Sequence, residues 1–111
     1  LFKWKTPYEN GRYGAMHALE VCFVFGSFWE DYLFTFPKRT PETEALSNKM
    51  SDYWISFAKN GIPNYNNCLE WPSYNKKDRK TMIFDKKIEI REDPLNLERK
   101  MWNKINIWPQ F

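Results

Sequence analysis

The most regular hydrophobic pattern in the chain lies between residues 40 and 61. Apolar side chains recur there at i, i+4, i+7, i+8 and i+11, which predicts one face of an amphipathic α-helix. The stripe consists of Leu46, Met50, Tyr53, Trp54 and Phe57. Thr40 and Pro41 suit the start of such a helix, and Gly61 is a natural stop.

The pattern after residue 80 is shorter and changes its period. Residues 81–93 predict two short strands around a turn at residues 85–87, with Ile88 and Ile90 alternating against Glu89 and Arg91. Asp93 and Pro94 then open a last predicted helix. Its apolar face would comprise Leu97, Met101 and Ile105, with Trp102 beside them.

The first 26 residues carry a more ambiguous pattern. Phe2 and Trp4 alternate as they would at the end of a β-strand, and residues 6–14 read as a loop. Residues 15–26 combine helical spacings with the β-branched and aromatic content of a buried strand. We expect a short helix that ends near Gly26, because glycine readily adopts the left-handed cap.

Composition bounds the possible functions. The 111 residues suffice for one domain with a modest core, and 19% of them are aromatic. A net charge of +3 does not indicate a nucleic-acid or membrane partner, and no apolar run is long enough to span a bilayer. The chain opens in mid-pattern without a methionine, so we expect a piece of a longer protein. Cys22 and Cys68 are predicted to be free thiols.

Few residues could bind a metal or cofactor. Histidine and cysteine together number three, fewer than a structural zinc site needs, and no glycine-rich phosphate loop is present. We therefore predict no metal and no cofactor. The basic stretch at residues 74–80 has an aromatic neighbour that could stack on bases. Because Asp78 interrupts it, a solvated loop is favoured and no nucleic-acid partner is expected.

His17 is the one remaining candidate for chemistry. A lone histidine among apolar residues is more often structural than catalytic, and both readings stay open here. Gly14 and Ala15 remove bulk beside the ring, and Glu20 follows three residues later. The segment also follows a predicted strand end, where α/β folds gather their active groups. These features permit catalysis but name no reaction.

Three blocks of the sequence resemble the type-B carboxylesterase family. Residues 14–26, GAMHALEVCFVFG, resemble its histidine segment, G-x-x-H-x-x-E followed by an apolar stretch that ends F-V-F-G. Residues 54–64 resemble its W-x-x-F-A-x-x-G-x-P-N block, and residues 71–85 its W-P-x-Y segment with the following strand. The blocks occur in the family's order and cover most of the chain. The resemblance is closest to the bacterial para-nitrobenzyl esterase type.

The resemblance implies an α/β fold, with residues 1–111 as the C-terminal part of a carboxylesterase α/β-hydrolase domain. Such enzymes hydrolyse small-molecule carboxylic esters through a triad in the order Ser, Asp or Glu, His. His17 matches the triad histidine. Glu20 matches a separate family position, and with Gly14 it would support the loop and cleft. Phe28 or Trp29 would be the better candidate for a substrate-pocket wall, although packing is favoured for both.

The chain has no G-x-S-x-G nucleophile motif, so we expect it to be inactive alone. We also expect it to self-associate through uncovered apolar faces. For the parent enzyme we expect a cytoplasmic location, with secretion left open. The alternative function is a small autonomous aromatic-rich binding module. A non-catalytic adhesion-type relative is disfavoured because His17 and Glu20 are both present.

Overall fold

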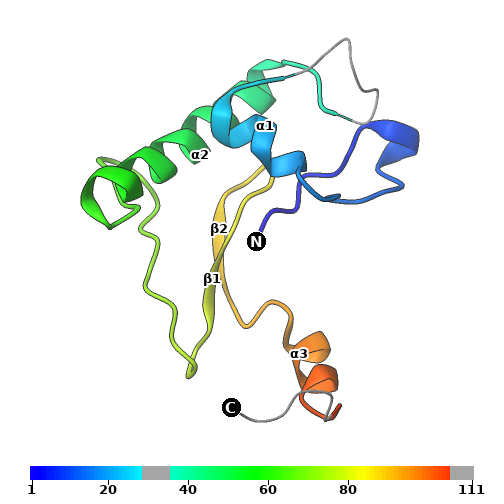
Figure 1. The fold of residues 1–111 in the computed structure, drawn as a ribbon, viewed down its shortest axis with the longest axis vertical. Helices are drawn as coiled ribbons and strands as arrows, with labels where there is room; N and C mark the ends of the chain where they lie inside the picture. The colour runs from blue at the N-terminus through cyan, green and yellow to red at the C-terminus, as the bar shows by residue number, and fades with distance from the viewer. Residues whose placement is uncertain (29–35, 106–111) are drawn as a thin grey trace.

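The computed structural model describes residues 1–28 and 36–105, so Trp29 lies outside the described residues. Two helices pack together beside a two-stranded hairpin, and a third helix lies at the opposite end of the molecule (Figure 1). The molecule measures 45 × 37 × 23 Å. In chain order the elements are η1 (Tyr8–Asn10), α1 (Leu19–Phe25), α2 (Pro41–Asn60), β1 (Lys80–Ile83), β2 (Glu89–Glu92) and α3 (Asn96–Trp102).

Helix α2 is the longest element, and both its predicted ends are confirmed. The Thr40 side chain accepts from the backbone N–H of Thr43, and Thr43 Oγ1 accepts in return from the N–H of Thr40 at 2.8 Å. This reciprocal pair satisfies two donors that a helix start otherwise leaves open. At the other end Gly61 adopts φ 71° and donates to the Phe57 carbonyl. The sequence thus fixes α2 at both termini by local chemistry.

The buried face of α2 differs from the predicted stripe. Leu46, Met50 and Tyr53 are buried as expected, but Trp54 and Phe57 are 42% and 59% exposed. Three hydroxyl residues are buried instead: Thr43, Ser47 and Ser56. The buried face is rotated relative to the predicted stripe because each of these hydroxyl groups donates to a backbone carbonyl of a segment packed against α2. The three polar side chains are therefore buried with their hydrogen bonds satisfied.

Two aromatic centres form the core between α1, α2 and the hairpin. The Phe23 ring of α1 lies within 5.4 Å of those of Phe2, Trp4 and Phe28, centroid to centroid. Tyr53 of α2 forms the second centre, edge-on to rings from the loop after α2 and from the hairpin. The predicted short helix at residues 15–26 is confirmed as α1, with Gly26 as its left-handed cap.

In place of the predicted strand end near the N-terminus, the structure has a single parallel bridge between Phe2 and Phe84. Lys3 donates to the Phe84 carbonyl at 2.7 Å, and the Phe84 N–H donates to Leu1. The predicted hairpin is confirmed: β1 and β2 pair antiparallel, with Lys80 opposite Glu92.

The apolar face of α3 has no cover in this structure. The helix forms as predicted, but none of its residues is buried. Leu97 and Met101 are 70% and 66% exposed, Trp102 is equally open, and Ile105 lies beyond the helix end. The three helices of the described part of the chain are each too short or too polar to cross a bilayer.

Candidate functional site

His17 lies in the turn immediately before α1 and is exposed to solvent. Ala18, between His17 and the helix, adopts a left-handed conformation at φ 64° and ψ 3°. That conformation is unfavourable for a residue with a Cβ and breaks the helical course of the chain. His17 is therefore not a helical residue, and its ring lies outside the core.

Glu20 occupies the first turn of α1 and is half-buried. Among the described residues, none of the ion pairs includes Glu20 or His17. The two residues are therefore neighbours along the chain without a direct charge contact.

Gly14 closes the loop that leads to His17. It adopts φ 57°, accepts from the Thr6 N–H at 2.9 Å, and donates to the Gly11 carbonyl. A Cβ built at Gly14 would meet no atom within 4 Å. The glycine is thus required by its backbone conformation and not by a close approach of other atoms.

Phe28 is a packing residue in this structure. Its ring stands edge-on to Phe23 at 81°, and the Arg39 guanidinium carbon lies 5.2 Å from its centroid. One face of the ring is thereby in contact with a cation from the segment before α2.

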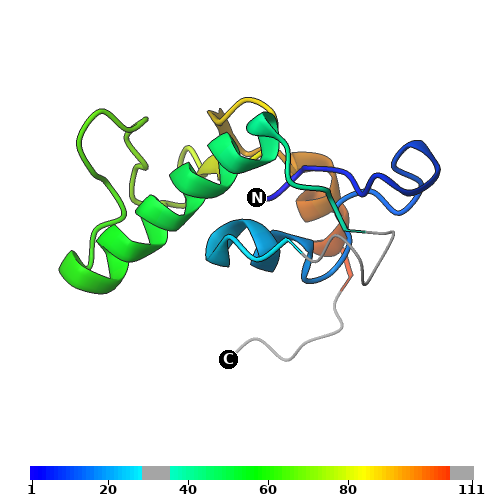
Figure 2. The same ribbon diagram turned by 90° about the horizontal axis from the view of Figure 1, so that it is seen from above.

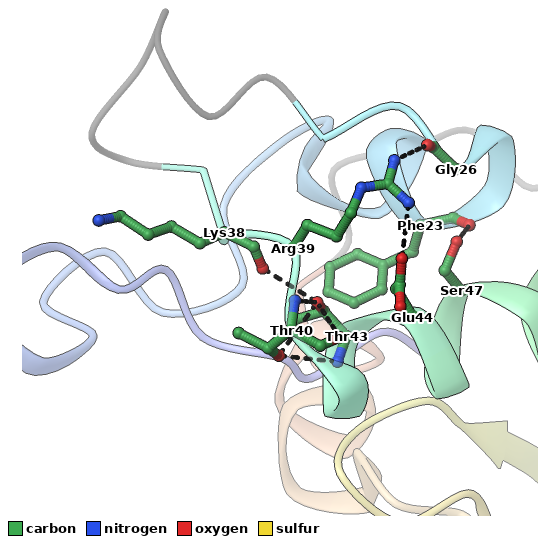
Figure 3. A network of polar contacts seen from close by, with 8 residues as sticks. All are labelled: Phe23, Gly26, Lys38, Arg39, Thr40, Thr43, Glu44 and Ser47. Atoms are coloured by element: carbon green, nitrogen blue, oxygen red, sulfur yellow. Dashed lines mark hydrogen bonds and ion pairs between the residues drawn. The ribbon is translucent and has the colours of Figure 1, made fainter.

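Three side chains fix the C-terminal end of α1, and we call Arg39, Ser47 and Ser51 the α1 anchor. The last carbonyls of a helix have no partners within it. Ser47 Oγ donates to the Phe23 carbonyl at 2.7 Å, and Ser51 Oγ to the Val24 carbonyl at 2.6 Å. Arg39 donates to the Gly26 carbonyl at 3.1 Å (Figure 3).

The anchor is itself held by the start of α2. Arg39 forms an ion pair with Glu44 at 2.8 Å, and Thr43 Oγ1 donates to the Lys38 carbonyl at 2.9 Å (Figure 3). Viewed from above, α1 lies alongside the N-terminal half of α2 (Figure 2). A seven-residue helix is too short to be stable alone. The anchor therefore fixes α1, and with it the turn that carries His17.

Cys22 does not offer a nucleophile at this site. Its thiol is buried on α1 and donates to the Leu19 carbonyl at 3.0 Å. Burial raises the pKa of Cys22 to about 11, so the thiol stays protonated near neutral pH. In the described ranges, no three His, Cys, Asp or Glu side chains come together as a metal site would require.

Comparison with known proteins identifies the family. The model of the family described as "Carboxylesterase family" matches residues 2–102. The chain belongs to the carboxylesterase family. The predicted family resemblance is therefore confirmed.

Two similar curated proteins carry esterase names. The chain is 38% identical over 104 residues to the para-nitrobenzyl esterase of Bacillus subtilis (strain 168), and the match covers 89% of this chain and 20% of that protein. It is 47% identical over 62 residues to human carboxylesterase 5A, covering 55% of this chain and 11% of that protein. The chain thus spans about a fifth or less of the length of these two relatives.

Solved carboxylesterases confirm the expected fold class. A para-nitrobenzyl esterase structure superimposes with a TM-score of 0.77 at 33% identity, over 98% of this chain and 21% of that one. The Geobacillus stearothermophilus carboxylesterase EST55 at pH 6.2 gives 0.72 at 33% identity, over 91% and 20%. The chain is a mixed helix and strand part of the α/β-hydrolase fold that these carboxylesterases adopt.

Sequence reasoning about this carboxylesterase-family chain missed the α1 anchor. Ser47 and Ser51 stand four residues apart on α2, so they share one helix face, but serines on a helix usually face water. The available signal was the order of the segments: a short helix that ends in glycine precedes a long helix that carries this serine pair.

Proposed function

We propose that this chain carries the triad histidine of a serine carboxylesterase, and that residues 1–111 form the C-terminal part of its α/β-hydrolase domain. One observation supports this most directly. The family match runs through a segment in which the only histidine of the chain is exposed at the edge of an anchored helix. A buried histidine bonded to local backbone would have favoured a structural role.

In the proposed mechanism His17 accepts one proton and then donates it again in each half of the reaction. The imidazole takes the proton of a serine hydroxyl while the serine oxygen attacks the ester carbonyl. The resulting imidazolium protonates the departing alcohol, which leaves an acyl-serine. His17 then takes a proton from water, the hydroxide attacks the acyl group, and the serine oxygen recovers its proton as the acid departs.

The remaining triad members lie outside this chain in the proposal. No G-x-S-x-G motif occurs in the 111 residues, so the sequence offers no elbow serine. Without the serine no acyl intermediate forms, and without the orienting carboxylate the ring is not held in one tautomer. We therefore expect the chain alone to be inactive, because triad residues act as a unit.

Glu20 and Gly14 have supporting roles in the proposal. The half-buried Glu20 stands in the first helical turn after His17, where a carboxylate is favourable to the helix dipole. Gly14 permits the tight turn on the other side of the histidine. Phe28 remains the candidate for a pocket wall, with its contact to Phe23 as the packing alternative.

A graft onto a relative tests the proposal. This chain replaces the aligned 104-residue stretch of the Bacillus subtilis para-nitrobenzyl esterase, and hydrolysis of a para-nitrobenzyl ester is followed. Such an ester is preferable to a nitrophenyl ester, which free imidazole cleaves by itself. We expect the graft to be active and its His17→Ala variant to lose about 10³-fold or more in kcat.

Two controls make the result specific. Lys38→Ala changes another exposed residue and should leave kcat within about twofold. The ungrafted 111-residue chain should show no turnover that depends on His17. An active, correctly folded graft in which His17→Ala retains full activity would contradict the proposal, and so would His17-dependent turnover by the chain alone.

A further inference from the structure

A hollow of about 660 Å³ lies between the C-terminal half of α2 and the loop that follows it. Its walls are mainly aromatic, and we call it the aromatic hollow. The residues that matter below are Tyr53, Trp54, Phe57, Glu70, Trp71 and Tyr74. Its volume is that of a small-molecule site, and no residue before Tyr53 lines it. It is therefore separate from the His17 turn.

The aromatic walls are fixed by their own contacts. The Trp71 ring lies 5.9 Å from that of Trp54 and 5.6 Å from that of Tyr53. The Asn64 side chain accepts from the Trp71 N–H at 2.6 Å, which ties the two sides of the loop together. Ser56 donates to the Ile62 and Asn64 carbonyls and ties the loop to α2. The hollow is thus formed before any ligand arrives.

The charge carried by the lining of the aromatic hollow is negative. Glu70 is the only charged residue that lines it, is exposed, and belongs to none of the ion pairs in the described residues. Arg79, a cation in contact with the lining, donates to the hydroxyl of Tyr74 at 2.8 Å. Arg79 thus meets the polar edge of that ring, and Asp93 offsets its charge.

We propose that the aromatic hollow binds a small organic cation with an alkylated ammonium group. Trp and Tyr rings attract such cations through their π-faces, and the groups' apolar methyls fit an apolar wall. Glu70 supplies the opposite charge at the rim. Trp54 and Tyr74 are 42% and 62% exposed, so their rings are accessible to a ligand. This inference does not depend on the proposed esterase function, and its test involves no ester hydrolysis.

The test compares two ligands of equal shape. (4-Hydroxyphenyl)trimethylammonium and 4-tert-butylphenol differ only in the exchange of a positive nitrogen for carbon. Each is titrated into the full 111-residue chain while tryptophan fluorescence and the ligand methyl proton resonance are recorded. A merely apolar hollow would prefer the neutral ligand, because the cation must lose water to enter. We expect the cation to bind about tenfold more tightly, with its methyl protons shifted upfield by the rings.

Matched variants locate the binding. Glu70→Gln should reduce the preference for the cation to about threefold, whereas Glu92→Gln, which removes an exposed carboxylate of β2, should leave it unchanged. Trp54→Leu should weaken cation binding about fivefold, whereas Trp102→Leu on the exposed face of α3 should not. Near-ultraviolet circular dichroism verifies that each variant keeps its fold.

Equal or tighter binding of 4-tert-butylphenol would overturn the proposal. Absence of binding at millimolar cation would overturn it as well, and so would an equal loss from Trp102→Leu. If Trp54→Leu fails to fold, Tyr74→Leu replaces it, since that side chain is more exposed.

Discussion

Helices α2 and α3 have similar apolar stripes in the sequence but different surroundings in the structure. Helix α2 buries six residues against α1, the loop after it and the hairpin, whereas α3 buries none. Within residues 1–28 and 36–105, the side-chain hydrogen bonds of α3 are local, such as those from Arg99 to Asp93 just before the helix. An amphipathic pattern therefore predicts that a helix forms, but not what covers its apolar face.

The difference fits a chain that spans about a fifth or less of the length of its two reported relatives. The apolar side chains of α3 would be covered by another surface, whether other parts of a longer protein or a second copy. The expected self-association of the chain stays a prediction, and α3 is the face through which it would occur.

The largest expected effect is the difference in stability between a substitution in the buried core and one on the exposed face of α3. Phe23→Ala should lower the free energy of unfolding by about 3–5 kcal/mol, because the ring is fully buried among three other aromatic rings. Leu97→Ala on α3 should change it by less than about 0.5 kcal/mol. Urea unfolding followed by far-ultraviolet circular dichroism measures both. Equal losses would show that α3 is buried in solution, and Phe23→Leu serves if the alanine variant does not fold.

The next effect concerns the α1 anchor. Ser47→Ala should cost about 1–3 kcal/mol, because it leaves the buried Phe23 carbonyl without its donor. The exposed Ser73→Ala should be neutral in the same urea experiment. A neutral Ser47→Ala would mean that the carbonyl is reached by water, and that α1 is held by apolar packing alone.

An alkaline effect should follow from Cys22. Its pKa of about 11 in the folded state lies above the ordinary thiol value, so the unfolded chain loses its proton first as the pH rises. The contribution of the thiol is present below pH 9 and should decline by roughly 1–2 kcal/mol between pH 9 and 11. The difference in stability between the Cys22→Ala variant and the unsubstituted chain should therefore shrink over that range. Urea unfolding of the two proteins at several pH values in this range measures the change.

The smallest effect concerns the ion pair between Arg99 of α3 and Asp93, which lies just before the helix. The bond from Arg99 holds the pKa of Asp93 below its ordinary range. Stability from this pair is present above that ordinary value, about 3.9, and is lost as the pH falls through the lowered one. Asp93→Asn should thus be less stable than the parent at pH 7 and equal to it in strong acid. Urea unfolding of the two proteins at several pH values below 7 measures this convergence.

Local chemistry made much of this fold predictable. The caps at Thr40 and Gly61, the glycine at the end of α1 and the turn at residues 85–87 are each decided by neighbours in sequence. The rotation of α2 was not predictable, because it depends on which backbone carbonyls of α1 and of the flanking segments accept from its hydroxyl groups. The exposure of Trp54 and Phe57 follows from that rotation.

The candidate site was also predictable from the sequence only in part. The motif around His17 indicated the family, and the structure places this residue at the surface. The left-handed conformation of Ala18, which separates His17 from the helix, could not be predicted because the neighbouring residues favour helices. Backbone strain at a residue that favours helices is invisible to propensity, since it is imposed by packing elsewhere.

The bridge between Phe2 and Phe84 also has a kinetic consequence. It joins the N-terminus to the hairpin, where the Leu1 amine donates to the Met82 carbonyl across 81 positions of chain. This contact closes a loop of 81 positions, and closing so long a loop costs entropy that local helical turns do not. The core should therefore close last during refolding, at a rate set by how the two distant segments find each other.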